Sequence, residues 1–268
     1  MQRGMTRWWV ALAAVIALGP SAWAGDLTAD EIMRRNEVVD KVADSRADVT
    51  MTLVSSSGAR RERSTQSSSK LTANGIDQKR LVRFLTPADV KGTGTLLVEH
   101  ADADDDIWIY LPALHKVRRL VANNKKDSFV GTDFSYGDII GHKVVSWTHA
   151  LAGTEQVDGA DTYIIDSVPR SDDVRETSGY AKRRSWIRTD NFVAVKVLYW
   201  DTAEKPLKEL HATDVRETDP AHHKWQAYRI VMSNTQTGHS TEIVWTKLEV
   251  GVGLSDDLFT ERELEKES

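Results

Sequence analysis

Short segments in which apolar and polar residues alternate, separated by turn residues, recur along most of this chain. In the first of them, Val49, Met51 and Leu53 alternate with threonines. Side chains that alternate with a period of two point to opposite faces of a strand. Asn74-Gly75 is a strong hairpin signal. We expect about a dozen short strands, over residues 49–54, 61–71, 80–85, 95–99, 107–111, 116–121, 144–152, 162–168, 181–188, 193–200, 208–215, 225–233 and 240–248.

This spacing predicts a mainly β (α+β) fold, in which a meandering antiparallel sheet curls into a barrel or half-barrel. One helix is predicted before the strands. Residues 28–31 have the pattern of a capping box, with threonine first and glutamate fourth. Ile32, Val39 and Val42 then form an apolar stripe at helical spacing. We expect this helix to end near Asp44.

Several predicted strands carry large side chains on both faces. Tyr199 is followed directly by Trp200, and Trp186 by Ile187, so each of these strands presents an aromatic or aliphatic group to either side. Two interpretations fit. The sheet could pack on a helix with one face and on a ligand, lid or partner with the other. Alternatively, it could be packed on both sides within an ordinary closed domain.

The first 24 residues have the pattern of a cleaved secretory signal. Two arginines precede a short apolar run at residues 10–18, and Ala22-Trp23-Ala24 is a small-x-small cleavage site. A membrane anchor is the alternative, but a spanning helix needs ~20 apolar residues. We therefore expect export to the periplasm and a single soluble domain over residues 25–268.

Cysteine usage and charge exclude several classes of function. The chain has no cysteine, which removes disulfides, thiolate metal sites, cysteine nucleophiles and bacterial lipidation. Without its two signal arginines the chain has 33 Lys and Arg against 40 Asp and Glu, a net charge of −7. An acidic domain without a basic tail argues against nucleic-acid binding.

No motif for catalysis or for a cofactor is recognisable. The aspartates at 102–106 lack the glycine and glutamate of a calcium loop. The eight histidines form no ligand pair typical of zinc. Ser67-x-x-Lys70 has no second hydrolase motif, and Gly92-Thr93-Gly94 is too short to cradle a phosphate. We therefore predict a protein that is not an enzyme, with no catalytic residues, no metal and no cofactor.

A cluster of large apolar residues between positions 108 and 147 is the best candidate for a binding site. Such side chains usually line small-molecule sites, with a few polar groups at the rim. Arg118 and Arg119 are the candidate rim, because guanidinium groups bind phosphate or carboxylate head groups. The alternative is that the aromatics are core and the arginines are solvated. The candidate lining is Trp108, Tyr110, Leu111, Leu114, Phe129, Phe134, Tyr136 and Trp147.

The same region resembles the LolA-like family of outer membrane lipoprotein-sorting proteins. The resemblance rests on three blocks: Phe-x-x-Pro-x-Asp-x-x-Gly-Thr at 84–93, Trp-x-Tyr-x-Pro at 108–112 followed by Val117-Arg118-Arg119, and Gly-Thr-Asp-Phe-Ser-Tyr-Gly-Asp at 131–138. The resemblance is close over these blocks. Over the rest of the chain, from about residue 29 to 263, it extends only to the order of the predicted helices and strands.

This resemblance implies a strongly curved, incomplete β-barrel whose open side is plugged by a few helices, with an apolar cavity for acyl chains. It implies a monomeric periplasmic carrier that takes a lipoprotein or lipid from an inner-membrane exporter to an outer-membrane acceptor, without inserting stably in a membrane. The 131–138 block marks a subgroup for which the cargo, lipoprotein or free lipid, stays open. The alternative function is an envelope sensor of the same fold that binds a lipoprotein and a signalling partner.

Overall fold

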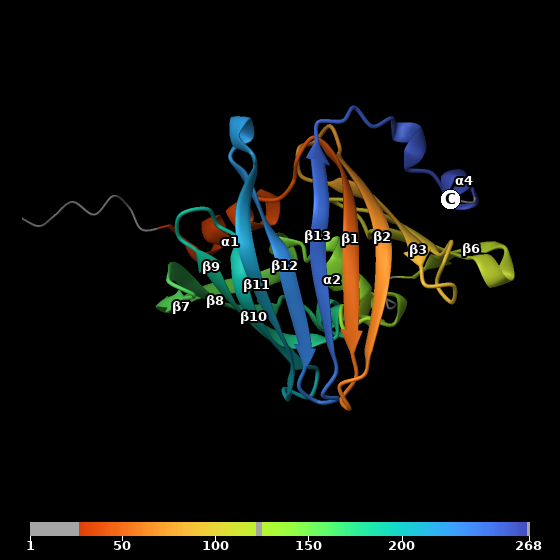
Figure 1. The fold of residues 1–268 in the computed structure, drawn as a ribbon. Helices are drawn as coiled ribbons and strands as arrows, with labels where there is room; N and C mark the ends of the chain where they lie inside the picture. Colours follow the sequence, from red (N-terminus) through yellow and green to blue (C-terminus); the bar gives the residue numbers. More distant parts are fainter. Residues whose placement is uncertain (1–26, 122–124, 267–268) are drawn as a thin grey trace, which may run out of the picture.

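The computed structural model describes residues 27–121 and 125–266, so the expected signal segment lies outside the described residues. Within these residues, thirteen strands form one antiparallel, strongly curved sheet that does not close on itself (Figure 1). This confirms the predicted fold class. The strands are β1 Asp44–Val54, β2 Arg60–Leu71, β3 Gln78–Thr86, β4 Gly94–Val98, β5 Asp106–Leu111, β6 Lys116–Leu120, β7 Trp147–Val157, β8 Ala160–Pro169, β9 Tyr180–Arg188, β10 Ala194–Asp201, β11 Pro206–Asp219, β12 Lys224–Asn234 and β13 Ser240–Val250.

The strand order is that of a meander interrupted once. Strands β1 to β6 run in sequence to one edge of the sheet, and β7 to β13 run in sequence from the other edge back to β1. Pairing of β1 with β13, from Ser45↔Val250 to Val54↔Ser240, joins the two halves. The link from β6 to β7 must therefore cross from edge to edge. We call its residues 125–146 the crossover segment.

The crossover segment covers the concave face of the sheet. It contains the short helix α2 (Tyr136–Ile140) and the 3-10 turns η3 (Phe129–Gly131) and η4 (Val144–Ser146). Figure 1 shows α2 behind β13 and β1, on the inner side of the curve. Four apolar side chains of the crossover segment, Phe129, Phe134, Tyr136 and Ile140, belong to the largest buried cluster. The other members of this cluster are Ala47, Val49, Met51, Val82, Phe84, Val90, Leu97, Ile107, Trp147, Tyr180, Val197, Tyr199, Met232 and Ile243.

Helix α1 (Ala29–Val38) covers the same face nearer to β7. The predicted capping box is confirmed, since Thr28 and Glu31 exchange hydrogen bonds. Ile32 packs against Ile165 of β8 and Ile187 of β9. The predicted end near Asp44 is wrong: the helix stops at Val38, because Asp44 is already extended and paired in β1. No helix in the described ranges is long and apolar enough to cross a membrane.

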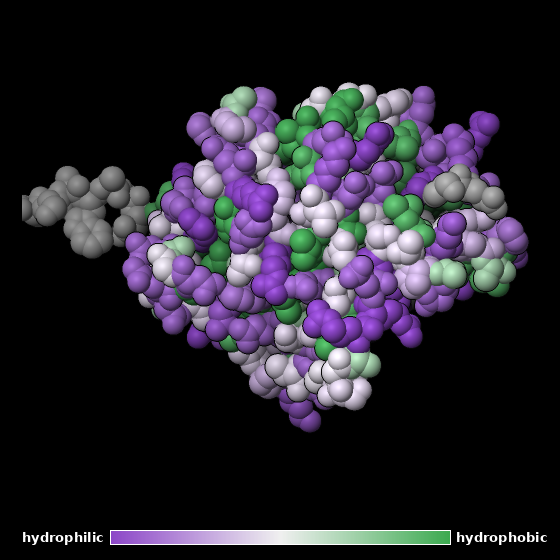
Figure 2. All heavy atoms as spheres, viewed as in Figure 1, coloured by the Kyte–Doolittle hydropathy of each residue, from purple (hydrophilic) through white to green (hydrophobic). Residues whose placement is uncertain are grey.

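The aromatic residues that alternate with core residues along β9 and β10 lie on the convex face of the sheet. Tyr199 is buried on the concave side, whereas Trp200 lies on the convex side beneath the Lys182 ammonium, 5.3 Å from its ring centre. Trp186 donates to Glu155, with Nε1 2.6 Å from Oε2. Charged side chains thus cover these rings. Figure 2 shows mainly hydrophilic and neutral residues over this outer face, with hydrophobic residues gathered near its top.

A second, smaller core lies on the opposite face of the β3–β6 half. The C-terminal residues beyond β13 form the turn η6 (Asp256–Leu258) and helix α4 (Glu261–Leu264). Leu264 and Phe259 are buried there against Leu81, Leu96 and Tyr110. The C-terminal segment therefore acts as a lid that removes apolar surface of the sheet from water.

Replacing Leu264 by alanine should lower the free energy of unfolding by about 2–5 kcal/mol, because a fully buried leucine leaves a cavity. Urea unfolding of the purified protein measures this loss. Leu114→Ala, at a site that is 55% exposed, is the matched control and should change stability little. Equal losses in both variants would contradict a docked C-terminal segment.

Candidate functional site

The structure divides the predicted apolar lining between the two faces of the sheet. Phe129, Phe134, Tyr136 and Trp147 lie together in the concave core. Phe129 meets Tyr136 edge-on with ring centroids 5.4 Å apart, and Trp147 meets His142 in the same way at 5.8 Å. These four residues form the part of the predicted site that the fold brings together.

The other four predicted residues do not join them. Trp108 and Tyr110 alternate with Ile107, and it is Ile107 that points into the concave core. Trp108 and Tyr110 face the second core, under the C-terminal segment. The eight residues therefore do not line one cavity. The alternation of a strand fixes which residues share a face, but not which face is concave.

The predicted polar rim lies at the sheet edge. Arg118 and Arg119 are exposed on edge strand β6, next to the turn η1 (Pro112–Leu114) that follows β5. Leu114 in this turn is exposed, and Leu111 is half-buried at the end of β5. Arg119 is paired with Asp106 and lies over the Trp108 ring, 5.9 Å from its centre. In the sheet order this rim is remote from β11 and β13, two of the strands whose side chains hold the crossover segment.

A buried carboxylate in the crossover segment organises the concave site. Ser135 and Asp138 cap α2 reciprocally, and the Ser135 amide donates to Oδ2 of Asp138 at 2.8 Å. Tyr180 of β9 donates its hydroxyl to Oδ1 at 2.9 Å. Lys208 of β11 places Nζ 2.5 Å from Oδ2. The side chains of Asp138 and Lys208 are only 3% and 6% exposed, so this is an ion pair removed from water.

The electrostatics of this centre keep Asp138 ionised. Burial alone would raise its pKa, but Lys208 and His142 reverse the effect and hold the pKa well below the ordinary value. Burial raises the pKa of the Tyr180 hydroxyl well above 10, with the Asp138 charge adding to it. Tyr180 therefore donates and does not ionise. Burial, then the charge of Arg183, lowers the pKa of His142 to about 4, so its ring is neutral at pH 7.

Other sheet side chains hold the crossover segment by its backbone. Arg63 of β2 donates to the carbonyl of Val130, with Nη1 2.5 Å from the oxygen. Arg80 of β3 donates to the carbonyl of Ile139 at 2.7 Å. Val130 has a left-handed φ of 47°, which is unfavourable for a β-branched residue and is held by these surroundings.

A third contact joins the segment to β13. The Thr241 hydroxyl accepts from the Asp133 amide at 3.0 Å and donates to Oδ2 of Asp133 at 2.7 Å. Lys208 also reaches the Asp133 carbonyl, with Nζ 3.1 Å from the oxygen. The segment is therefore tied to both halves of the sheet by side-chain contacts.

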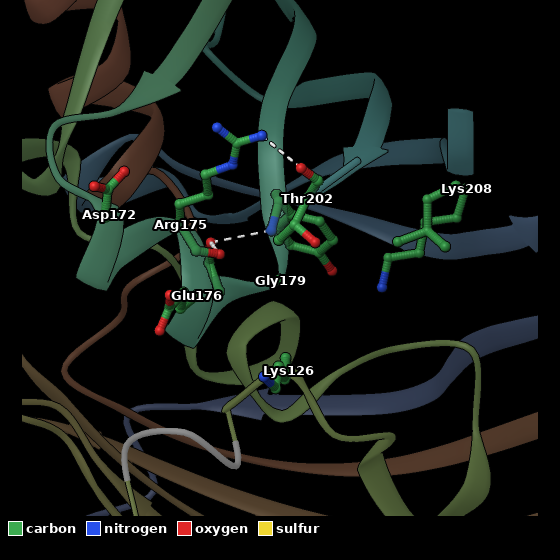
Figure 3. Close-up of a pocket in the computed structure, with 10 residues that line it drawn as sticks. Lys126, Asp172, Arg175, Glu176, Gly179, Thr202 and Lys208 are labelled. Atoms are coloured by element: carbon green, nitrogen blue, oxygen red, sulfur yellow. Dashed lines mark hydrogen bonds between the residues drawn. The ribbon is translucent and has the colours of Figure 1, made fainter. Parts of the chain in front are cut away.

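A cavity of about 620 Å³ opens beside the buried ion pair (Figure 3). It lies between α3 (Asp172–Ser178), the crossover residue Lys126 and the start of β11. Tyr180 and Lys208, which hold Asp138, also line it. In Figure 3 Asp172 and Glu176 lie on one side and Lys208 on the other. The anchored part of the crossover segment is thus close to space that solvent can enter.

Sequence reasoning missed the ion-pair centre. A Ser-x-x-Asp pattern at 135–138 could have predicted the cap of α2. Nothing local marks Tyr180 or Lys208 as partners, because they lie 42 and 70 residues from Asp138 in the chain. Within the residues that the structure describes, no group of three or more His, Cys, Asp or Glu is arranged to hold a metal ion.

Comparison with known proteins gives consistent similarities over nearly the whole chain. A family model described as an uncharacterized protein matches residues 76–266. A Vibrio parahaemolyticus domain described as an outer membrane lipoprotein-sorting protein has a TM-score of 0.81 and 29% identity, covering 89% of this chain and 98% of that one. A DUF1329 family protein from Desulfovibrio piger has a TM-score of 0.81 and 30% identity, covering 88% and 97%.

A more distant structure shares the fold. A LolA superfamily protein from Nitrosomonas europaea has a TM-score of 0.68 and 19% identity, covering 89% of this chain and all of that one. Among curated protein sequences, none matches.

Replacing Lys208 by methionine should cost about 3–5 kcal/mol of unfolding free energy, because it leaves the Asp138 charge buried without its partner. Adding Asp138→Asn should recover most of this loss. The matched control is Lys247→Met, whose exposed pair with Glu249 is worth less than about 1 kcal/mol. Similar losses at both lysines would show that the buried pair does not anchor the structure.

Acid should destabilise the protein partly through His142. Its folded pKa of about 4 lies below the unfolded value of 6.5, so the unfolded chain takes up the proton first as the pH falls. The contribution of the neutral His142 ring to the free energy of unfolding is complete above pH 6.5 and is lost by about pH 4. It amounts to about 3 kcal/mol. Urea unfolding of wild type and His142→Gln over pH 4–8 measures it.

The stability difference between wild type and His142→Gln should therefore shrink as the pH falls through this window and stay constant above pH 7. His239→Gln, at an exposed position, is the control and should run parallel to wild type. A parallel profile for His142→Gln as well would contradict a neutral, buried His142.

Proposed function

This chain belongs to the LolA-like family of outer membrane lipoprotein-sorting proteins, and on that premise we propose that it is a periplasmic carrier of acyl chains. The acyl chains belong to a lipoprotein or a lipid. They occupy the concave face of the sheet after the crossover segment is displaced. The role is binding and transfer, without catalysis.

The observation that carries this proposal is the contrast between the concave face and its cover. Both halves of the sheet contribute apolar side chains to this face, among them Met51, Phe84 and Met232. Among the described residues, the crossover segment that covers them forms no ladder with the sheet; its β-bridge, Ser128↔Ser135, is internal. Polar side-chain contacts and the packing of its own apolar side chains hold it. The polar contacts can be exchanged for water, whereas the apolar surface needs another apolar partner.

The energetics favour an acyl chain as the replacement. Exposing the concave face to water would be unfavourable, but an acyl chain laid there keeps it dry. Each methylene group gains ~0.8 kcal/mol when it leaves water. We propose that Phe129, Phe134 and Tyr136 of the segment and Trp147 of β7 contact this chain, since their side chains are buried in the core that the segment shares with the sheet. The cavity beside Lys208 is the proposed entrance.

The proposed route runs between the two membranes of the envelope. The expected signal segment supports export to the periplasm. An inner-membrane exporter would supply the amphiphile and an outer-membrane acceptor would receive it. A carrier with a net negative charge is repelled by anionic membrane surfaces, which favours release after each transfer.

Locking the crossover segment to the sheet should block uptake. Because the chain has no cysteine, Asp133→Cys with Thr241→Cys introduces a single possible disulfide where the two side chains are already in contact. The oxidised double variant should bind a fluorescent fatty-acyl probe at least about 10-fold more weakly than its reduced form. Probe titrations before and after reduction measure this.

A disulfide that does not restrain the segment is the control. Ser45→Cys with Ser69→Cys would join β1 to β2, where the two hydroxyls are 2.8 Å apart. This variant should bind the probe equally in both redox states. Undiminished binding by the oxidised form of the variant altered at Asp133 and Thr241 would refute the proposed opening. Absence of probe binding by wild type would refute the carrier function.

A further inference from the structure

Arg183 is a buried cation to which the described residues supply no anion of its own. It lies on the concave face of β9 and is only 7% exposed. Its Nε has no hydrogen-bond partner, and none of the ion pairs in the described ranges involves it. Its guanidinium carbon lies 4.2 Å from the centre of the Trp147 ring, so the indole covers one side of the charge.

The groups around Arg183 do not compensate its charge. Its cross-strand neighbours are Ser167 on β8 and Tyr199 on β10, both neutral. Burial raises the pKa of the Tyr199 hydroxyl, so this group stays protonated. The carboxylate that acts on Arg183 is Asp138, which is already bound by Lys208, Tyr180 and the Ser135 amide.

The two neighbouring histidines add no charge of their own next to Arg183. His142 and His149 both have their pKa lowered, first by burial, and the charge of Arg183 contributes to both shifts. His149 is held in place by Ser167 and by the Val144 carbonyl, with ring nitrogens 2.8 and 3.1 Å from these oxygens. Neither ring adds a charge at pH 7, so the Asp138 carboxylate, which Lys208 already binds, is the carboxylate that acts on Arg183 here.

A buried, unpaired guanidinium is unfavourable unless another interaction offsets its desolvation cost. A cation–π contact offsets part of the cost but satisfies none of the five N–H donors. The planar fork of an arginine matches the oxygens of a carboxylate or phosphate, which it can bind with two parallel hydrogen bonds. No residue in the described ranges supplies such an anion to Arg183.

We propose that Arg183 binds the anionic head group of the carried amphiphile, a carboxylate or a phosphate monoester, inside the concave face. The inference rests on the proposed carrier function and specifies its cargo as anionic. The acyl chain then extends from Trp147 along the apolar cluster. Burial of Arg183 beside Trp147 places the head group in the interior, whereas the exposed Arg118 and Arg119 would leave it in water.

The test compares three 18-carbon probes that differ only in the head group: oleic acid, oleyl phosphate and oleyl alcohol. Each displaces an uncharged fluorescent acyl probe from the mature protein at pH 7.5. Wild type should bind the two anions about 10- to 100-fold more tightly than the alcohol, as expected for charge-assisted hydrogen bonds. Arg183→Met should bind the alcohol within about twofold of wild type and lose the preference for anions.

A matched variant controls for the loss of an arginine from the same strand. Arg184→Met removes the next arginine of β9, which is paired with Asp166 on the convex face. It should keep the wild-type preference for anions. Loss of this preference in Arg184→Met, or its retention in Arg183→Met, would overturn the proposal.

Stability separates a binding role from a structural one. Without ligand, Arg183→Met should unfold at the same temperature as wild type or higher, since it removes an unpaired buried charge. A lower midpoint that Arg183→Lys restores, with no change in head-group preference, would show a structural role. If Arg183→Met does not fold, Arg183→Lys serves as the test, because lysine keeps the positive charge but lacks the planar guanidinium group. Its preference for the anionic probes over the alcohol should be smaller than that of wild type.

The remaining outcomes test the head-group site and the carrier function separately. Equal affinities of wild type for oleate and oleyl alcohol would overturn the head-group site and leave the carrier function standing. No binding of any probe would overturn both. A further outcome is that inorganic phosphate binds with the same affinity as oleyl phosphate and in a manner that depends on Arg183. That result would show a site for free anions and would overturn the proposal that the ligand is an amphiphile.

Discussion

The buried pair of Asp138 and Lys208 is the interaction on which the concave site depends. Its attraction must offset the cost of removing two charges from water, and Tyr180 and the Ser135 amide supply the extra hydrogen bonds that make this possible. One end of the pair is in the crossover segment and the other in β11. The apolar concave face therefore stays covered for as long as a polar contact is kept.

The strand order makes such a contact necessary. Strands β6 and β7 are consecutive in the chain but lie at opposite edges of the sheet, so the link between them must cross the sheet. It crosses on the inside of the curve. Residues 128–138, which include the last of the three family blocks, belong to this link. Their aromatics complete the core, and the crossover segment is held from both halves by Arg63, Arg80 and Thr241. A cover built in this way can be released without breaking the sheet.

The sequence predicts the strands well because period-two alternation and turn residues are local. Each of the thirteen expected ranges overlaps a strand, and the cap of α1 is where it was expected. Tertiary contacts could not be predicted in the same way. Trp108 and Ile107 differ in the face they occupy, and the curvature that makes one face concave is a property of the whole sheet. Lys208 and Arg183 are ordinary strand residues in sequence, and only the fold brings them to Asp138 and Trp147.

These observations describe a curved apolar sheet closed by a polar-tethered segment, with an unpaired arginine beneath it. The central claim is that this interior receives an amphiphile. Native mass spectrometry of the mature protein, purified from the periplasm without detergent and followed by lipid extraction, tests it most directly. The account predicts a bound species of acyl-chain mass that carries an acidic head group. Protein that is empty as isolated and takes up no fatty-acyl probe would contradict it, and the concave aromatics would then be structural core alone.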